Sequence, residues 1–450
     1  MTIRFVGLLL VVVLATCRAG AEAPDPSAAM HLSFEVRVEP SARDDGRRSV
    51  ALFGDEVLGI GLEPSGAWSC RIRNAAAEVV LDYTTTVPRQ RIDDGRWHRI
   101  GVTLDVARSE VRFRFNGRAV AVYSAHGIDL ASITAGLAAP PPDALIRPSS
   151  GEAPAFRIRA VSRTAARPGP DAAHAVQSVM PSPAIVSVMA FNIWRGGRED
   201  GAEIGVQRTI DVIRAADPDI VCMQETYGSG PRIADALGYH FYLRSSNLSV
   251  MSRYPIEETF DLYQPFRFGA CRVRLGRGAS VIVCPLWIHH LPDVWGDPPT
   301  PETDMDALIA AEMETRGSEI RGILDALQPW IDNAAAEPVI VAGDFNSMSH
   351  LDWSEAYRHL HGGVAVDWPV SRAMTDAGFR DTFREAHPDV EARRGITWSP
   401  RFRDALQTRI DYVYVLGDRL RTVDAVMLDR HPVRWPSDHA AVLSTLRWVE

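Results

Sequence analysis

The sequence predicts an α/β domain built on a large sheet, preceded by a smaller all-β domain. Short alternating apolar runs separated by turn residues recur through residues 28–161, a pattern typical of a β-sandwich or jelly roll. From residue 185 to residue 450, apolar strands alternate with helical segments, which indicates a sheet core covered by helices. Residues 162–184 are rich in Pro, Ala and Arg and show no regular spacing of apolar residues, so we expect a linker there.

Composition narrows the class of protein. The chain has 450 residues, 46% hydrophobic and 23% charged, which excludes a disordered chain, a coiled coil and a small disulfide scaffold. All 48 basic residues are Arg, so chemistry that depends on a lysine amine is excluded. The net charge is −9 and the second domain is acidic, which disfavours non-specific binding of nucleic acid.

The amino-terminal segment indicates export. Arg4 precedes an apolar run, residues 5–16, which suits a signal-peptide core and is too short to span a membrane. Small residues at 19–21 offer a cleavage site, so we expect residues 1–21 to be a signal peptide and the protein to be secreted or periplasmic. The alternative is a lipid anchor at Cys17, because the residues before it are similar to a lipoprotein signal. No later segment is long and apolar enough to span a membrane.

The first domain contains regularly spaced runs with strand character. The expected strands are Leu32–Val38, Ser49–Phe53, Trp68–Arg73, Val79–Tyr83, Arg99–Leu104, Val111–Phe115, Ala119–Tyr123 and Ala155–Val161. The turn at Asp94-Gly95, the following Trp97 and the hairpin signal Asn116-Gly117 resemble laminin-G and concanavalin-like jelly rolls. We expect Trp97 in the core; the alternative is a domain that binds a glycan or a cell surface.

The second domain mixes both kinds of element. Its expected strands are Ile185–Ile193, Ile220–Gln224, Val250–Ser252, Cys271–Leu275, Ser280–His289, Val339–Ala342, Tyr412–Leu416 and Ala440–Leu446. Its expected helices are Ala202–Ala215, Arg232–Leu237 and one long helix, Pro301–Leu327, with an apolar stripe along one side.

Polar motifs follow the expected strands of the second domain. Loops at strand ends gather on one edge of a sheet, so their side chains should meet there. These side chains are Asn192, Glu225, His290, Asp344, Asn346, Asp411, Asp438 and His439. Four converging carboxylates repel one another unless a cation lies among them. Hard oxygen ligands without a zinc pattern favour Mg²⁺ or Mn²⁺, with Ca²⁺ as an alternative.

In chain order the motifs are Asn192, Gln224-Glu225, His290-Leu291, Gly343-Asp344-Phe345-Asn346, Thr397-Trp398, Arg409-Ile410-Asp411-Tyr412 and Ser437-Asp438-His439. The set and its order resemble the endonuclease/exonuclease/phosphatase (DNase I-like) superfamily over residues 186–450. The resemblance implies a four-layer α/β sandwich. It also implies divalent-metal-dependent hydrolysis of a phosphodiester or phosphomonoester by in-line attack of water.

The resemblance also implies a role for each residue. The implied metal ligands are Asn192, Glu225 and Asp438. The implied catalytic residues are His290, Asp344, Asn346, Asp411 and His439. Asp344 would orient or deprotonate the water, and His439, fixed by Asp411, would face the phosphate. His290 and Asn346 would hold phosphate oxygens; His290 is chosen over His289 because it directly precedes Leu291.

Two other functions remain open. One is an extracellular endonuclease or exonuclease acting on nucleic acid. The other is a surface- or glycan-binding protein whose second domain is inactive, although the expected residue type at every site position disfavours it.

Four cysteines lie beyond residue 21, at no zinc spacing: Cys70, Cys222, Cys271 and Cys284. A two-residue turn at Arg277-Gly278 would place Cys271 opposite Cys284, where a disulfide could form. The alternative is two buried free thiols on one face of the hairpin.

Overall fold

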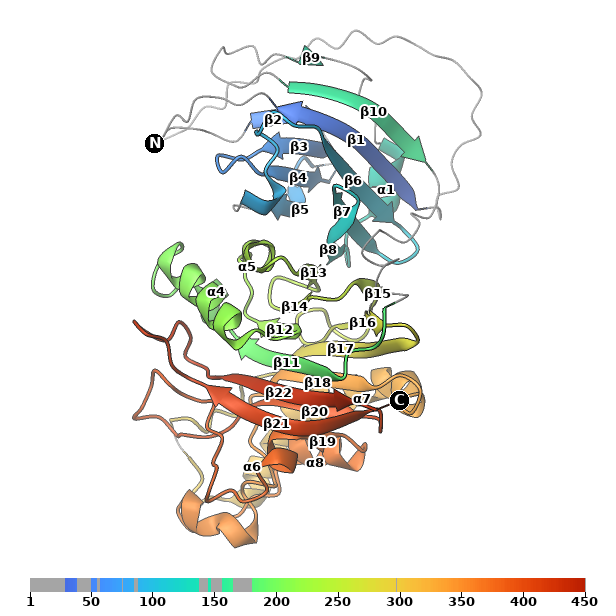
Figure 1. The fold of residues 1–450 in the computed structure, drawn as a ribbon. Helices are drawn as coiled ribbons and strands as arrows, with labels where there is room; N and C mark the ends of the chain where they lie inside the picture. The colour runs from blue at the N-terminus through green and yellow to red at the C-terminus, as the bar shows by residue number, and fades with distance from the viewer. Residues whose placement is uncertain are drawn as a thin grey trace.

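A computed structural model of the protein describes residues 29–38, 50–54, 57–74, 76–84, 88–136, 145–146, 156–164, 180–296 and 298–449. The expected signal peptide and Cys17 lie outside these residues. The described chain forms a β region followed by an α/β region (Figure 1). None of its helices combines the length and the apolar character needed to cross a membrane.

The amino-terminal region is a β-sandwich of two antiparallel sheets. One contains β1 (Met30–Val38), β6 (His98–Asp105), β7 (Glu110–Phe115), β8 (Arg118–Ser124), β9 (Leu145–Ile146) and β10 (Phe156–Thr164). The other contains β2 (Val50–Gly54), β3 (Leu58–Leu62), β4 (Trp68–Arg73) and β5 (Val79–Thr84). Strand β3, the helix α1 (Leu130–Gly136) and the 3-10 turn η1 (Pro88–Gln90) were not expected from the sequence. The two-sheet arrangement agrees with an all-β domain, while the finer likeness to a jelly roll stays a prediction.

Two expectations for this region differ from the structure. Strand β10 runs through Thr164, so its last residues occupy the start of the segment expected as a linker. Trp97 is only half-buried, and the guanidinium of Arg159 lies 3.9 Å from its ring centroid. The fully buried tryptophan of the sandwich is Trp68, whose indole N–H donates to Gln90. An arginine therefore covers the ring that the sequence placed in the core.

The α/β region contains two facing sheets. The first contains β11 (Ile185–Asn192), β12 (Ile220–Gln224), β13 (His240–Leu243), β14 (Ser249–Ser252), β21 (Leu420–Leu428) and β22 (Ala441–Trp448). The second contains β15 (Ile256–Phe260), β16 (Ala270–Gly276), β17 (Ala279–Trp287), β18 (Val339–Asp344), β19 (Arg380–Asp381) and β20 (Asp411–Leu416). The helical segments are α3 (Trp194–Gly197), α4 (Ile204–Ala216), α5 (Gly230–Leu237), α6 (Met305–Glu314), α7 (Arg316–Asp332), η2 (Glu355–His361), α8 (Pro369–Asp376) and α9 (Thr382–Ala386).

Side-chain alternation along the central strands creates the layers. In β11, Val188 and Ala190 face the second sheet, while Met189 and Phe191 face helix α4. Both faces of the strand are buried, which explains its unbroken apolar sequence. Helices α7 and α8 cover the outer face of the second sheet through a separate apolar cluster. The result is the four-layer arrangement that the sequence resemblance implied (Figure 1).

The long helix expected over Pro301–Leu327 is wrong. The structure has α6 and α7 instead, separated at Thr315, whose φ of −104° and ψ of −98° are not helical. The Thr315 hydroxyl donates to the backbone oxygen of Leu291 at 2.7 Å. An apolar stripe continues across this break, so periodicity alone could not reveal it.

The pairing that would place Cys271 opposite Cys284 does not occur; the two thiols are free and buried, as in the alternative, but they do not share one face. The two-residue turn is present, but a bulge between Arg274 and Gly276 shifts the register, and Cys271 lies opposite Val283. The shift by one residue sends the two thiols to opposite faces of the sheet. All four described cysteines are buried and free.

The two regions share one continuous sheet. Strand β8 of the sandwich pairs in parallel with β13 of the α/β region, which creates a sheet of 12 strands (Figure 1). One apolar cluster runs through both regions and joins Phe113 and Tyr123 to Phe241. Pairing with β13 covers the edge of β8, which would otherwise expose unpaired backbone groups.

A buried carboxylate lies where the regions meet. Asp235 Oδ1 accepts a hydrogen bond from Gln90 at 3.1 Å, and Oδ2 has no hydrogen-bond partner among the described residues. Burial raises the pKa of Asp235 to about 6, against the lowering effect of Gln90 and two nearby arginines. The folded protein therefore binds this proton more tightly than the unfolded chain does.

We expect this carboxylate to make stability depend on pH. Since the pKa of Asp235 is raised, its contribution is most favourable below pH 4 and is lost as the pH rises through about 6. The full shift corresponds to an upper value of about 3 kcal/mol. Asp235→Asn should therefore gain stability over the native protein at pH 7.5 and lose that advantage at pH 4.5. Thermal unfolding at both pH values measures this; an equal difference at the two would contradict it.

Candidate active site

Strand ends from both sheets deliver the candidate residues to one edge of the α/β sandwich. Asn192 ends β11, Glu225 follows β12, and Asp344 ends β18. Asp411 begins β20, and Asp438 and His439 lie two to three residues before β22. Gly343 permits this arrangement, because a Cβ there would collide with the backbone oxygen of Leu286 on the neighbouring strand.

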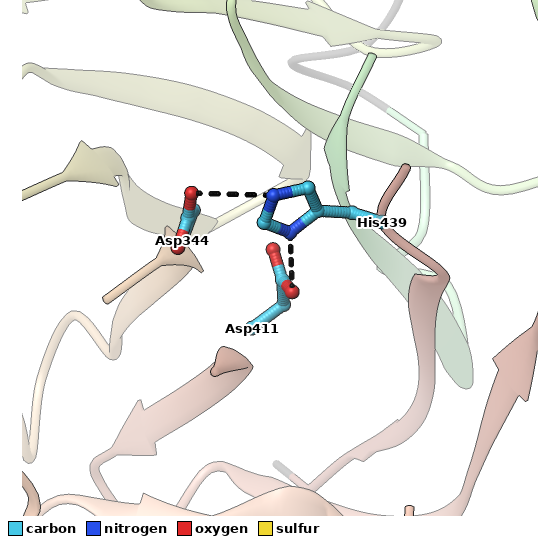
Figure 2. A group of neighbouring side chains, drawn as sticks. All are labelled: Asp344, Asp411 and His439. Carbon is cyan, nitrogen blue, oxygen red and sulfur yellow. Dashed lines mark hydrogen bonds and ion pairs between the residues drawn. The ribbon is translucent and has the colours of Figure 1, made fainter. Parts of the chain in front are cut away.

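A histidine lies between two buried carboxylates (Figure 2). His439 Nδ1 donates to Asp411 Oδ2 at 2.9 Å, and His439 Nε2 lies 3.8 Å from Asp344 Oδ2. All three side chains are at least 95% buried. The Asp411 contact fixes the ring orientation and directs Nε2 toward Asp344 and the site.

Burial and charge shift the pKa values of this group. Burial alone would lower the pKa of His439, but the charges of Asp411 and Asp344 outweigh it, so that pKa lies well above its ordinary value. Burial raises the pKa of Asp344 to about 7; His439 lowers it and Asp411 raises it. The imidazole is therefore held in its charged form, as expected of a group that donates to a phosphate oxygen or a leaving group.

Asn192 connects the two halves of the site. Its amide nitrogen donates to Glu225 Oε1 at 3.2 Å and to Asp344 Oδ2 at 3.1 Å. Its oxygen accepts the backbone N–H of Trp194 at 3.0 Å. The other oxygen of Glu225 accepts the backbone N–H of Arg195 at 2.8 Å. One buried amide thus joins carboxylates from the two sheets.

Backbone conformation at the site is unusual. The described residues other than glycine that have positive φ include four at or beside the site: Trp194 (53°), Arg195 (50°), Glu225 (54°) and Asn346 (46°). Such conformations are costly for residues other than glycine and cluster at functional sites.

The residues present suit a divalent cation. Asp411 Oδ1 and Asp438 Oδ1 are buried and lack a hydrogen-bond partner among the described residues. Burial raises the pKa of Asp438 to about 6. The charge of His439 opposes this rise, and the charge of Glu225 contributes to it. The expected ligands Glu225 and Asp438 thus repel each other. A cation between them would relieve this repulsion and satisfy the orphaned oxygen.

The structure also offers a second candidate ligand group. Asp344, Asp411 and His439 each present one ligand atom, all within 4.8 Å of one another. His439 Nδ1, however, already donates to Asp411, which leaves only Nε2 as a ligand atom, whereas Glu225 and Asp438 offer the carboxylate oxygens that hard cations prefer. The position beside Glu225 and Asp438 is therefore the better one for a cation.

The remaining predicted residues lie near this group in different ways. Asn346 is buried, and its amide nitrogen donates to the backbone oxygen of Ile288 at 2.9 Å and to Asp344 Oδ2 at 3.3 Å. His290 is exposed and stacks on His289 at 4.9 Å. No hydrogen bond or ion pair within the described chain joins His290 to another predicted site residue. The structure thus brings together seven of the eight predicted residues and leaves His290 at the rim.

Sequence reasoning missed several residues that hold the site. The fully buried Arg316 pairs with Glu312 at 2.8 Å and donates to the backbone oxygens of Asn346 and Pro292. This pair ties the loop of Asn346 to the loop of His290. Asn247 accepts the backbone N–H of Glu225 at 2.9 Å. Its only sequence signal is a position just before a strand.

Comparison with known proteins identifies the family. Residues 189–439 match the model of the Endonuclease/Exonuclease/phosphatase family, more than half of the chain. An uncharacterized Caenorhabditis elegans protein, F14F9.5, is 28% identical over 294 residues, which cover 59% of this chain and 92% of that protein.

Two solved structures have low sequence similarity to this chain. Truncated Caenorhabditis elegans TDP2 is 18% identical with a TM-score of 0.40, covering 58% of this chain and 98% of that one. The 3'-5' exonuclease NExo of Neisseria meningitidis is 17% identical with a TM-score of 0.43, covering 58% of this chain and 100% of that one. On the match to the family model, this chain belongs to the Endonuclease/Exonuclease/phosphatase family of hydrolases.

Proposed function

We propose that the protein is a divalent-metal-dependent phosphoesterase that hydrolyses a phosphodiester or a phosphomonoester by in-line attack of water. The single observation that carries the proposal is the Asp411–His439–Asp344 array beside Glu225 and Asp438. A charged imidazole there faces a group of carboxylates. These carboxylates would repel a negatively charged phosphate substrate unless a cation is also bound among them.

Each residue has a role in this proposal. Glu225 and Asp438, with Asn192 beside them, would hold Mg²⁺ or Mn²⁺, or Ca²⁺ as the alternative. A cation held there would supply positive charge that offsets the charge of the phosphate and makes water more acidic. Asp344 would accept the proton of the attacking water, since its carboxylate lies at the end of the array that adjoins Asn192 and Asn346. His439 donates a hydrogen bond from Nε2 to the phosphoryl group, and Asp411 stabilises its charge. Asn346, and His290 once substrate is bound, would hold phosphate oxygens.

The substrate side of the proposal has a direct test. The purified protein is assayed on bis- and mono-(4-nitrophenyl) phosphate, a phospholipid diester and DNA, with Mg²⁺ and with excess EDTA. We expect turnover of at least one substrate that chelation abolishes and Mg²⁺ or Mn²⁺ restores. Full activity in EDTA would reject the metal-dependent mechanism. A preference for DNA would favour the second candidate, an extracellular nuclease, which the acidic charge of the α/β region disfavours.

Glu225→Gln should weaken metal binding without unfolding the protein. An amide oxygen lacks the carboxylate charge that attracts a hard dication, so the Mn²⁺ dissociation constant should rise by about 10-fold or more. Calorimetric titration of Mn²⁺ into both proteins measures the change. Glu199→Gln, a partly exposed glutamate in the adjoining loop, serves as the matched control and should bind Mn²⁺ as the native protein does. Equal affinity in all three proteins would remove Glu225 from the metal site.

The proposal extends to location. Export to the periplasm or the medium is inferred from residues 1–21, with lipid anchoring at Cys17 as the alternative. Binding of a glycan or cell surface by the sandwich is a further proposal of the sequence, and the Arg159 side chain over Trp97 does not favour that ring as a sugar platform.

A further inference from the structure

Among the contacts between the amino-terminal sandwich and the α/β region, the pairing of β8 with β13 leads toward the active site, through the loop that follows β13. Ala121, Val122 and Tyr123 of β8 pair with Phe241, Tyr242 and Leu243 of β13. The residues that follow β13, 244–248, form a tight loop that returns into β14. Any displacement of β13 relative to the rest of the sheet would therefore move this loop.

The loop is fastened at its first residue. Arg244 is 2% exposed and donates to Ser124 Oγ of β8 at 3.2 Å and to the backbone oxygen of Phe268 at 3.0 Å. It also forms an ion pair with Asp261 at 2.6 Å. A single buried guanidinium thus connects the end of β8 to the loop and to the second sheet.

The other end of the loop holds the metal-binding segment. Asn247 is fully buried, and its Oδ1 accepts the backbone N–H of Glu225 at 2.9 Å while its Nδ2 donates to the backbone oxygen of Phe266 at 2.9 Å. The Asn247 backbone oxygen accepts from Thr226 at 3.0 Å, and that of Ser246 accepts from Tyr227 at 2.7 Å. Three consecutive residues after β12 therefore depend on this loop.

Glu225 needs such support. Its φ of 54° is unfavourable for a glutamate, so the surrounding contacts must hold the backbone in that conformation. Because the side chain leaves the backbone at this residue, a change in φ would turn the carboxylate away from Asn192. Residues that orient metal ligands in this way typically change metal affinity by about 10- to 100-fold when they are removed.

We propose that the amino-terminal sandwich holds Glu225 in its metal-binding position, through strands β8 and β13, Arg244 and the side chain of Asn247. The inference rests on the proposed function, because it concerns the metal site assumed there. It gives the sandwich a role in the active site itself, with Asn247 as a positioning residue. No ligand of the sandwich is required for this role.

Metal affinity in the full-length protein tests the proposal. Mn²⁺ is titrated by calorimetry, and kcat is measured as a function of Mg²⁺ concentration. Asn247→Ala should raise the Mn²⁺ dissociation constant about 10-fold, with kcat recovering at saturating metal. Ser124→Ala, a change within the sandwich, should raise it by about twofold to threefold, because Arg244 keeps its other partners. A purely structural role would lower the thermal midpoint without changing the metal dependence.

Two controls match these variants. Ser246→Ala changes an exposed side chain of the same loop, and Ser69→Ala removes a buried sandwich hydroxyl that has no hydrogen-bond partner among the described residues. Both should bind Mn²⁺ as the native protein does. If Asn247→Ala does not fold, Arg244→Lys replaces it, since lysine keeps the charge beside Asp261 but cannot reach Ser124 and Phe268 together.

The outcomes separate the two proposals. If the native protein binds no Mn²⁺, the proposed function fails. If the native protein binds Mn²⁺ and Asn247→Ala or its replacement Arg244→Lys binds it equally well, the positioning role is overturned and the metal site stands. If Ser124→Ala behaves as Ser69→Ala does, the contribution of the sandwich is overturned.

Discussion

Asp344→Asn is expected to lower kcat by about 10³-fold while leaving the protein at least as stable as the native form. The loss follows because an amide cannot accept the proton of the attacking water. The stability follows from burial, which raises the pKa of Asp344 to about 7. Above that pH, the buried negative charge of Asp344 destabilises the folded protein. Asparagine keeps the shape and removes the charge, and this gain offsets the hydrogen bonds from Asn192 and Asn346 that its amide nitrogen cannot accept.

Steady-state kinetics on a nitrophenyl phosphate and a thermal melt at pH 8 measure both parts of this prediction. Asp418→Asn, at a side chain that is 84% exposed, provides the control and should match the native protein in both measurements. Native kcat in Asp344→Asn would remove Asp344 from the mechanism. A large fall in the unfolding temperature would instead indicate a structural residue.

The carboxyl-terminal fold could be predicted because its strands are buried on both faces. Val188, Met189 and Ala190 read as one apolar run, and the polar residue that ends such a run marks the edge of the sheet. The eight predicted site residues were chosen in this way, at strand ends, and seven of them meet in the structure. Their position required only the direction of each strand.

Contacts that depend on register or on the second region could not be predicted in this way. One extra residue in the hairpin before Gly276 moved Cys271 from Cys284 to Val283, and no residue type marks that bulge. The pairing of β8 with β13 joins segments about 120 positions apart, and neither strand carries a signal for its partner. The side chain of Asn247 accepts the backbone N–H of Glu225, a contact that appears only when the loop is folded.

Asp411→Asn is expected to lower kcat by about 10²-fold at pH 7.5, and by more as the pH rises. Asp411 accepts the Nδ1 proton of His439 at 2.9 Å and is the largest of the charges that raise the pKa of that imidazole. Without this charge the pKa falls toward its ordinary value of about 6.5. The native enzyme should keep a charged His439 in mildly alkaline solution, where the variant should hold a neutral ring that no longer stabilises the phosphoryl charge.

The ratio of native to variant kcat, measured from pH 6 to pH 9 at saturating metal, therefore tests the charge and not only the geometry. Thr397→Val supplies the matched comparison, because the Thr397 hydroxyl accepts the backbone N–H of Asp411 at 3.1 Å. That variant loses an orienting contact and keeps the carboxylate, so its loss of kcat should be the same at every pH. If the Asp411 charge keeps His439 protonated, its loss should lower kcat most at high pH, where a free imidazole is neutral. A ratio for Asp411→Asn that does not change with pH would therefore show that Asp411 only orients the ring.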